Sequence, residues 1–193
     1  MKKILITTGG TGGHITPAEI IGEHLNDIYD VHYSTDLRGE KFFTPNKEKT
    51  TIINTPKLNF DFIIPFKILK IIYLTIKSIH YLRIKKIYKV ISIGGYMSLP
   101  IIIAAKILGL EIFLLEPNKV LGRGNKFFLN FAKKIIYFSN KLINFPQKYY
   151  NKIELINPLV FKKFYEINKN DGINKKFCFL ITGGSQGAKI FDG

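Results

Sequence analysis

The chain has 193 residues, of which 46% are hydrophobic and 22% charged, and this composition excludes a disordered or fibrous protein. A single cysteine excludes a disulfide framework and a cysteine-rich zinc module. The formal net charge of +15 favours polyanionic partners such as nucleic acid, anionic lipid or phosphorylated substrates, although an AT-rich coding sequence produces the same lysine surplus.

The N-terminal apolar run ends at Thr7 and is too short for a signal peptide. A greasier stretch at residues 60–76 is interrupted by Asp61, Pro65 and Lys67, so we expect no membrane-spanning helix there. Short apolar runs predict buried strands, and longer patterns with a helical period predict helices between them. The predicted strands are residues 3–7, 31–34, 51–53, 90–93, 112–115 and 135–138. The predicted helices are residues 17–26, 66–86, 100–108 and 125–133.

This alternation predicts an α/β fold with a Rossmann-like parallel sheet and helices on both faces. A second start follows late in the chain, where a strand at 177–181 precedes another glycine-rich loop, as at the N-terminus. The segment between, residues 162–176, is polar and resembles a linker. We therefore expect one domain over residues 1–161, a linker over 162–176, and only the first strand and glycine loop of a second domain over 177–193.

The first glycine loop, residues 9–14, reads GGTGGH and lies between a predicted strand and a helix. Glycines allow close backbone approach, and free N–H groups at a helix start attract phosphate. Ile15 stands where the dinucleotide fingerprint needs its third glycine, and no Walker lysine follows. Asp36 still leaves a nicotinamide nucleotide open, because an acidic residue there imitates the ribose ligand. A tight turn without a ligand is the other alternative.

Three more loops follow predicted strands: residues 94–100 read GGYMSLP, 116–118 read EPN, and 183–188 read GGSQGA. The carboxyl ends of parallel strands share one edge of the sheet, where ligands of open α/β sheets bind. Several anion cradles at one edge favour a substrate with more than one phosphate.

These four ordered motifs resemble the MurG family of bacterial glycosyltransferases. The resemblance implies the two-domain GT-B fold and an inverting transfer of GlcNAc from UDP-GlcNAc to the C4 hydroxyl of lipid I, giving lipid II, without a metal or other cofactor. It implies a peripheral protein on the cytoplasmic side of the inner membrane. Nearly all of the donor-binding domain is missing, so we expect these 193 residues alone to be inactive.

The resemblance also implies roles for individual residues. It assigns UDP-GlcNAc binding to Thr11, Gly12, Gly13, Asn118 and Ser185. It assigns the lipid acceptor and its pyrophosphate to Gly10, Gly94, Gly95 and Tyr96. It gives catalytic roles to His14 and Glu116.

An imidazole at His14 could remove the proton of the acceptor hydroxyl, and Glu116 is the rival base. The alternatives are that His14 only caps the glycine loop and that Glu116 is a surface carboxylate. The sequence contains no Asp-x-Asp motif, so we predict no catalytic metal.

Some positions depart from the family pattern. Pro117 lacks a backbone donor, and Leu99 replaces a usual glycine. Val160 and Phe161 occupy the neighbourhood of an expected arginine, where Lys162 is the nearest cation but cannot reproduce a bidentate guanidinium contact.

The helix predicted at residues 66–86 carries large apolar residues beside lysines. An apolar surface bordered by lysine would rest on an anionic membrane surface, and the alternative is an ordinary core helix. The predicted membrane patch is Phe66, Lys67, Lys70, Ile72 and Lys77.

Two further function classes remain open. One is a membrane-associated module that binds a lipid pyrophosphate without catalysis. The other is a basic nucleic-acid binder, but the chain lacks an arginine-rich patch and an aromatic stacking motif, so we expect no nucleic-acid partner.

Overall fold

A parallel sheet is the centre of the computed structural model, which describes residues 1–10, 12–43, 47–57 and 62–165. Its described strands number seven, in the order β3-β2-β1-β4-β5-β6-β7, and every pair is parallel. The strands are β1 Lys3–Thr7, β2 Asp30–Thr35, β3 Thr50–Ile52, β4 Ile87–Ser92, β5 Glu111–Glu116, β6 Lys134–Tyr137 and β7 Ile153–Leu155.

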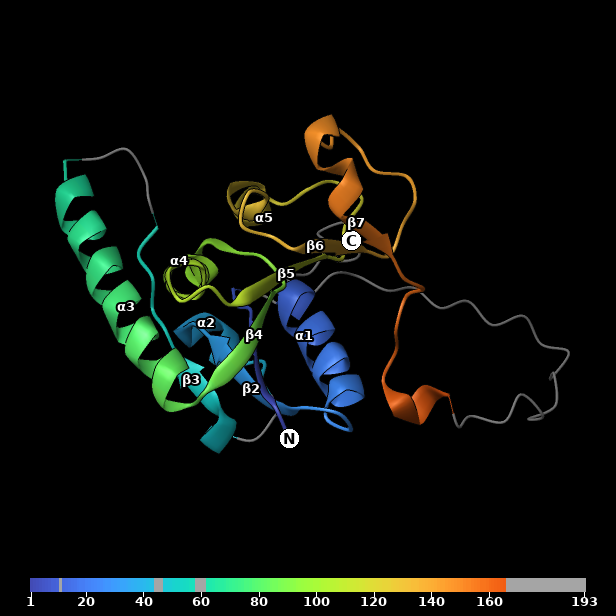
Figure 1. Ribbon diagram of the computed structural model, residues 1–193, viewed down its shortest axis with the longest axis horizontal. Coiled ribbons are helices and arrows are strands. Elements are labelled where there is room, and N and C mark those ends of the chain that lie inside the picture. Colours follow the sequence, from blue (N-terminus) through green and yellow to red (C-terminus); the bar gives the residue numbers. More distant parts are fainter. Residues whose placement is uncertain (11, 44–46, 58–61, 166–193) are drawn as a thin grey trace, which may run out of the picture.

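Helices cover both faces of the sheet (Figure 1). The α-helices are α1 Gly12–Leu25, α2 Leu37–Glu40, α3 Ile64–Ile84, α4 Leu99–Ile107 and α5 Arg123–Phe128. The 3₁₀ helices are η1 Lys47–Lys49, η2 Tyr96–Ser98, η3 Gln147–Lys152 and η4 Lys162–Phe164. The predicted α/β fold, with its parallel sheet between helical layers, is confirmed.

Strand alternation divides the core between the two faces, because successive side chains of a strand point to opposite sides. Ile4 and Ile6 of β1 pack in the same cluster as Ala18 of α1. Leu5 packs on the other face, in the cluster that contains Leu82 of α3 and residues of α4 and α5. A strand that is buried on both faces therefore has a continuous apolar sequence, and for this reason the first and last residues of β1 were both predicted correctly.

Among the differences from the prediction, those at α1, α5 and β7 are the most informative. Helix α1 begins at Gly12 rather than at Pro17, so the second half of the glycine motif forms its first turn. Glycine has a low helix propensity, which hides this start in the sequence. Helix α5 ends at Phe128, before its predicted end at residue 133, and the edge strand β7 was missed because it is short and mostly exposed.

The strand order reverses between β1 and β4, which are neighbours in the sheet although six elements of the sequence separate them. Such a reversal splits the connections to opposite faces and leaves a crevice at the carboxyl ends of the two strands. The loops that leave β1 and β4 at this point are the first two glycine loops.

The last described residues return to α1. The Lys162 N–H donates to Glu23 over 2.8 Å, and the Lys162 Nζ lies 2.6 Å from an Asp27 oxygen. The predicted linker thus begins with a segment that contacts α1, while the rest of it and the predicted second-domain start at 177–193 lie outside the described residues.

Candidate functional site

The loops after β1, β4 and β5 meet at the carboxyl edge of the sheet. The Thr7 hydroxyl at the end of β1 donates to the Ser98 hydroxyl over 3.2 Å, and Ser98 in turn donates to the Gly94 carbonyl over 3.1 Å. These buried bonds join the end of β1, just before the first glycine loop, to the second glycine loop, so the two loops leave the sheet side by side.

The second and third loops are interlocked through two glycines. Gly95 has a φ of +87°, a conformation that favours glycine. A Cβ at Gly124, in the first turn of α5, would lie 2.8 Å from the Gly95 nitrogen and 3.0 Å from its carbonyl oxygen. The two backbones therefore approach more closely than any side chain would permit.

The Glu116 carboxylate organises the third loop. Its Oε1 accepts from the Asn118 backbone over 3.2 Å and from the Asn118 amide over 3.1 Å. Its Oε2 accepts from the Gly122 N–H over 2.8 Å and from the Asn125 amide over 3.1 Å. Since Glu116 is only 1% exposed, this carboxylate is a buried anchor, and its geometry favours a positioning role over that of a base.

Asn125 is a site residue that the sequence analysis placed only at a helix start. It is buried, and its amide also donates to the Leu115 carbonyl over 3.1 Å. Its Oδ1 has no hydrogen-bond partner among the described residues, although an ideal Cβ at Gly94 would lie 3.5 Å from it. Nothing in the sequence marked this residue, because an asparagine before a helix usually signals a cap.

His14 lies in the first turn of α1, directly after the glycines. The Thr8 hydroxyl donates to its backbone carbonyl over 2.8 Å, which ties the turn to the end of β1. The ring is partly exposed, and its Nδ1 is buried without a hydrogen-bond partner among the described residues. Among the described residues the ring makes no hydrogen bond to the glycine loop, and it lies at the edge where Gly12 and Gly13 present first-turn N–H groups.

Asp36 joins the first glycine loop to the end of β2. It is 3% exposed, and its Oδ1 accepts from the N–H groups of Gly10 and Gly39, each over 2.9 Å. Its Oδ2 accepts from Arg38 Nε over 3.0 Å. Both oxygens are thus occupied by protein, which argues against Asp36 as the ribose ligand of a nicotinamide nucleotide.

Arg38 is a second residue that the sequence analysis did not select. Its Nη2 donates to the Tyr96 hydroxyl over 2.8 Å, and this bond connects α2 to the loop after β4. The sequence signal available for Arg38 was its position two residues after Asp36. Its contact with Tyr96 could not be predicted, because only the fold brings the two together.

The predicted site residues that the structure describes converge on this edge. They are Gly10, Gly12, Gly13, His14, Gly94, Gly95, Tyr96, Glu116 and Asn118. Thr11 and Ser185 lie outside the described residues.

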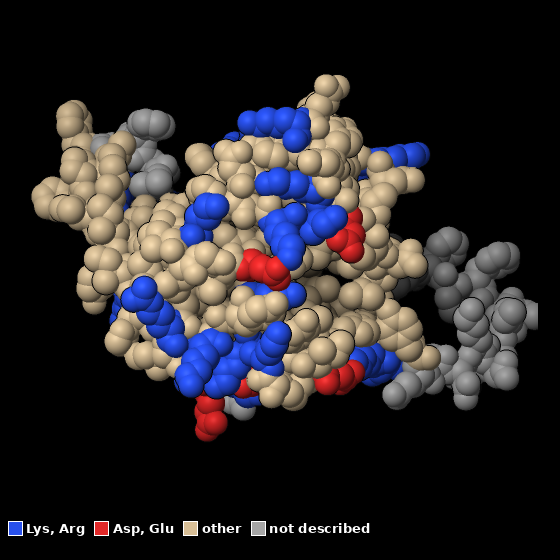
Figure 2. Space-filling model, in the orientation of Figure 1, with Lys and Arg blue, Asp and Glu red and all other residues tan. Residues whose placement is uncertain are grey.

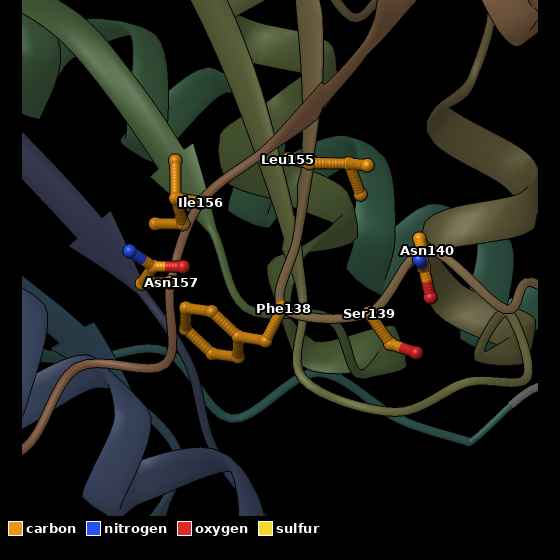
Figure 3. A pocket seen from close by; sticks show the side chains of 6 residues that line it. All are labelled: Phe138, Ser139, Asn140, Leu155, Ile156 and Asn157. Atoms are coloured by element: carbon orange, nitrogen blue, oxygen red, sulfur yellow. The ribbon is translucent and has the colours of Figure 1, made fainter.

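An open hollow of about 550 Å³ continues the edge beyond β5 (Figure 3). Phe138, Ser139 and Asn140 line it from the segment after β6, and Leu155, Ile156 and Asn157 line it from the end of β7 onward. The hollow therefore extends the row of loops along the carboxyl ends of the strands and offers amide and hydroxyl groups to a polar ligand.

Lys162 lies away from this edge. Its Nζ pairs with Asp27, which follows the C-terminal end of α1, whereas the glycine loop is at the N-terminal end of the same helix. The neighbouring Val160 carbonyl lies 2.9 Å from His24 Nε2, also near that far end. Lys162 thus offers no substitute for the arginine that the family pattern expects.

Helix α3 presents an apolar surface to solvent. Its buried residues are Ile71, Thr75, Ser78 and Leu82, and the two hydroxyls bond back to helix carbonyls. The large exposed side chains of α3 and the residues just before it are Phe62, Ile63, Phe66, Ile68, Leu69, Ile72, Tyr73, Ile76 and Ile84. In Figure 2 the projecting end of α3, at the upper left, is mostly tan.

Of the predicted membrane patch, Phe66 is 72% and Ile72 50% exposed. Lys70 and Lys77 are exposed as well, whereas Lys67 is half-buried. No helix in the described part of the chain is both long enough and apolar enough to span a bilayer. The described residues also contain no cluster of three His, Cys, Asp or Glu side chains suited to a metal ion.

Comparisons with known proteins agree with this architecture. The family model described as the glycosyltransferase family 28 N-terminal domain matches residues 4–137. The UDP-N-acetylglucosamine–N-acetylmuramyl-(pentapeptide) pyrophosphoryl-undecaprenol N-acetylglucosamine transferase of Pelagibacter ubique is 48% identical over 196 residues, which cover 99% of this chain and 54% of that protein. The transferase of the same name from Rickettsia canadensis is 36% identical over 194 residues, again covering 99% of this chain and 54% of the relative.

Solved structures show the same fold. Acinetobacter baumannii MurG superposes with a TM-score of 0.64 at 23% identity, over 80% of this chain and 45% of that one. The UDP-GlcNAc 2-epimerase of Methanocaldococcus jannaschii reaches 0.57 at 16% identity, over 80% and 45% of the two chains. The chain spans about half the length of the curated relatives it matches. With the family 28 model matching residues 4–137, the chain belongs to glycosyltransferase family 28 and, within it, to the MurG family.

Proposed function

We propose that this chain is the acceptor-binding part of an enzyme that transfers GlcNAc from UDP-GlcNAc to the C4 hydroxyl of lipid I, giving lipid II. The two named relatives support the reaction, since their names specify the donor sugar and the pyrophosphoryl-undecaprenol acceptor. One observation on this chain carries the proposal: at the switch point, hydrogen bonds join the end of β1 to the glycine loop after β4, and Gly124, in the segment after β5, packs against Gly95 of that loop.

We propose that His14 is the base that accepts the proton of the acceptor hydroxyl. It is partly exposed at the edge of the loops, and its Nδ1 has no hydrogen-bond partner among the described residues. Glu116 lacks that freedom because four donors already surround its carboxylate. We therefore assign Glu116 to positioning Asn118 and Gly122, with Asn118 reaching toward the nucleotide sugar.

We propose that α3 rests on an anionic membrane surface. A solvent-facing helix normally exposes polar residues and buries apolar ones. On α3 two of the four buried residues carry hydroxyl groups, while Phe66, Leu69 and Tyr73 are exposed to solvent. An acceptor with a polyprenyl tail would reach the glycine loops from the bilayer, so the apolar helix and the phosphate cradles serve one substrate.

The direct test is binding of a short-chain lipid I analogue, a muramyl-peptide pyrophosphate on a soluble prenyl group, to the 193-residue chain. We expect measurable binding by isothermal titration calorimetry without UDP-GlcNAc, because the acceptor cradles belong to the described fold. Prenyl alcohol without the pyrophosphate serves as the control and should not bind. Binding of UDP with no binding of the analogue would refute the assignment of this half to the acceptor.

A lipid-pyrophosphate-binding module without catalysis is the second candidate, because the joined glycine loops after β1 and β4 would serve binding alone equally well. Incubation with UDP-GlcNAc and the same analogue separates the two. We expect no transfer above background from these 193 residues alone, and turnover by the purified chain would contradict that expectation.

A further inference from the structure

Arg38 projects from α2 at the edge where the glycine loops lie. Its Nη2 donates to the Tyr96 hydroxyl over 2.8 Å, and its Nε and Nη2 each lie 3.0 Å from the Asp36 Oδ2. Asp36 follows β2 and Tyr96 follows β4, so the side chain bridges the elements on either side of β1. These contacts hold the guanidinium in one place, although 49% of the side chain is exposed.

The negative charge of Asp36 lies beside the first glycine loop, and a cation must balance it before the loop can bind an anion. Burial alone would raise the pKa of Asp36, but the hydrogen bonds from Gly10, Gly39 and Arg38 outweigh burial and hold that pKa below its ordinary value. The carboxylate is therefore ionised and lies 2.9 Å from the Gly10 nitrogen. Without Arg38, this buried negative charge would repel any anion that entered the loop.

The same contact removes one donor from the cradle. The Gly10 N–H points to Asp36 and is not available to a ligand. The Arg38 guanidinium lies beside the loop and can supply a donor in its place. Its closeness is shown by the 3.8 Å that would separate Nη2 from a Cβ built on Gly10. Among the described residues no acceptor is assigned to the Arg38 Nη1, which is left for a ligand oxygen.

We propose that Arg38 is a phosphate-binding residue at the mouth of the glycine loops, held ready by Asp36 and Tyr96, and that it selects acceptors that carry a pyrophosphate. The inference rests on the proposed function and names the side chain that supplies the positive charge. Arginine suits this task because its planar fork bonds to Asp36 and Tyr96 while Nη1 still faces a ligand, and because it stays charged at every working pH.

The experiment measures binding of inorganic pyrophosphate to the whole chain by calorimetry. We expect Arg38→Met to weaken binding about tenfold or more, as the loss of a charge-assisted contact predicts. Arg38→Lys keeps the charge that neutralises Asp36 but loses the fork, so it should fold normally and still bind several-fold more weakly. Arg83→Met removes an exposed arginine at the end of α3 and should bind like the unchanged chain. Thermal melting of each variant verifies folding.

Unchanged affinity in Arg38→Lys and Arg38→Met, or an equal loss in Arg83→Met, would overturn the inference. The lipid I analogue separates it from the proposed function. If the analogue binds the unchanged chain and Arg38→Met equally, the acceptor assignment stands and Arg38 fails. If Arg38→Met loses pyrophosphate while the unchanged chain binds the analogue no better than bare pyrophosphate, the anion site stands and the muramyl acceptor fails.

Discussion

At the residue scale, buried charged and titratable groups decide how the site is built. Asp36 and Glu116 are both carboxylates below 4% exposure; Asp36 accepts a backbone N–H from the first glycine loop, and Glu116 accepts backbone N–H groups from the loop that it begins. The sequence showed where these acids stand relative to the strands. It did not show their partners, because Gly10 and Gly122 reach them only after the chain has folded.

Replacing Glu116 by Gln tests the anchor. The amide would turn an NH₂ group toward donors from Asn118, Gly122 and Asn125, so we expect a loss of about 1–3 kcal/mol in unfolding free energy. Urea denaturation measures it, and hydrogen exchange at Gly122 should accelerate. Glu154→Gln is the matched control. The Glu154 side chain is 55% exposed, and its ion pair with Lys134 is long, at 4.0 Å. Equal stability of the two variants would refute the anchoring role.

His32 gives the chain a pH-dependent stability. Burial lowers the pKa of its imidazole, Asp30 partly offsets this shift, and Lys3 and Lys85 add to it. The unfolded chain takes up this proton near pH 6.5, the folded chain only at lower pH, so stability must fall as the pH drops below 6.5. The slope for one proton is at most about 1.4 kcal/mol per pH unit.

Urea denaturation of His32→Asn and His80→Asn between pH 7 and pH 5 measures this effect. The first variant should flatten the curve, while the second, at an exposed position on α3, should keep the slope of the unchanged chain. A slope that survives in His32→Asn would assign the proton to another group.

At the element scale, the site depends on loops that touch through glycine. Strand and helix positions were predictable from apolar periodicity, as β1 and α3 show. The contact between Gly95 and Gly124 was not predictable, because a glycine motif indicates a close backbone approach but not which segment makes it. The start of α1 was missed for a related reason, since Gly12 and Gly13 serve the loop and the helix at once.

Gly124→Ala tests the interlock. The added Cβ would collide with the Gly95 backbone, so we expect a cost of roughly 1–3 kcal/mol in unfolding free energy and weaker pyrophosphate binding. Gly109→Ala is the control: its φ of +67° strains an alanine by roughly 1 kcal/mol, but nothing lies within 4 Å of the new Cβ. Both variants should lose stability in urea, yet Gly109→Ala should bind pyrophosphate normally, and equal binding by both would contradict the interlock.

At the scale of the whole molecule, the edge that carries the glycine loops and the apolar face of α3 belong to one domain with a surplus of positive charge. The composition indicated that charge but could not assign it, because lysine bias and membrane attraction give the same count. On the fold, Lys70 and Lys77 are exposed on the helix that also carries exposed aromatic and aliphatic side chains, which is the arrangement that the membrane proposal requires.

Reversing those two charges tests the membrane proposal. Each lysine near an anionic surface contributes about 1 kcal/mol, so Lys70→Glu with Lys77→Glu should reduce co-sedimentation with phosphatidylglycerol vesicles at least about tenfold. The control is Lys148→Glu with Lys163→Glu, in η3 and η4, which makes the same change of net charge away from α3. If both variants were released from the vesicles to a similar degree, the net positive charge alone, and not α3, would account for vesicle binding.

The exposed apolar side chains of α3 also govern how the protein behaves once it is isolated. With Phe66, Leu69 and Tyr73 facing water, a lipid-free preparation offers these side chains no cover except a second molecule or a detergent micelle. Mild non-ionic detergent, rather than added salt, is therefore the condition that keeps concentrated samples monodisperse: salt weakens charge contacts while strengthening the association of exposed apolar faces.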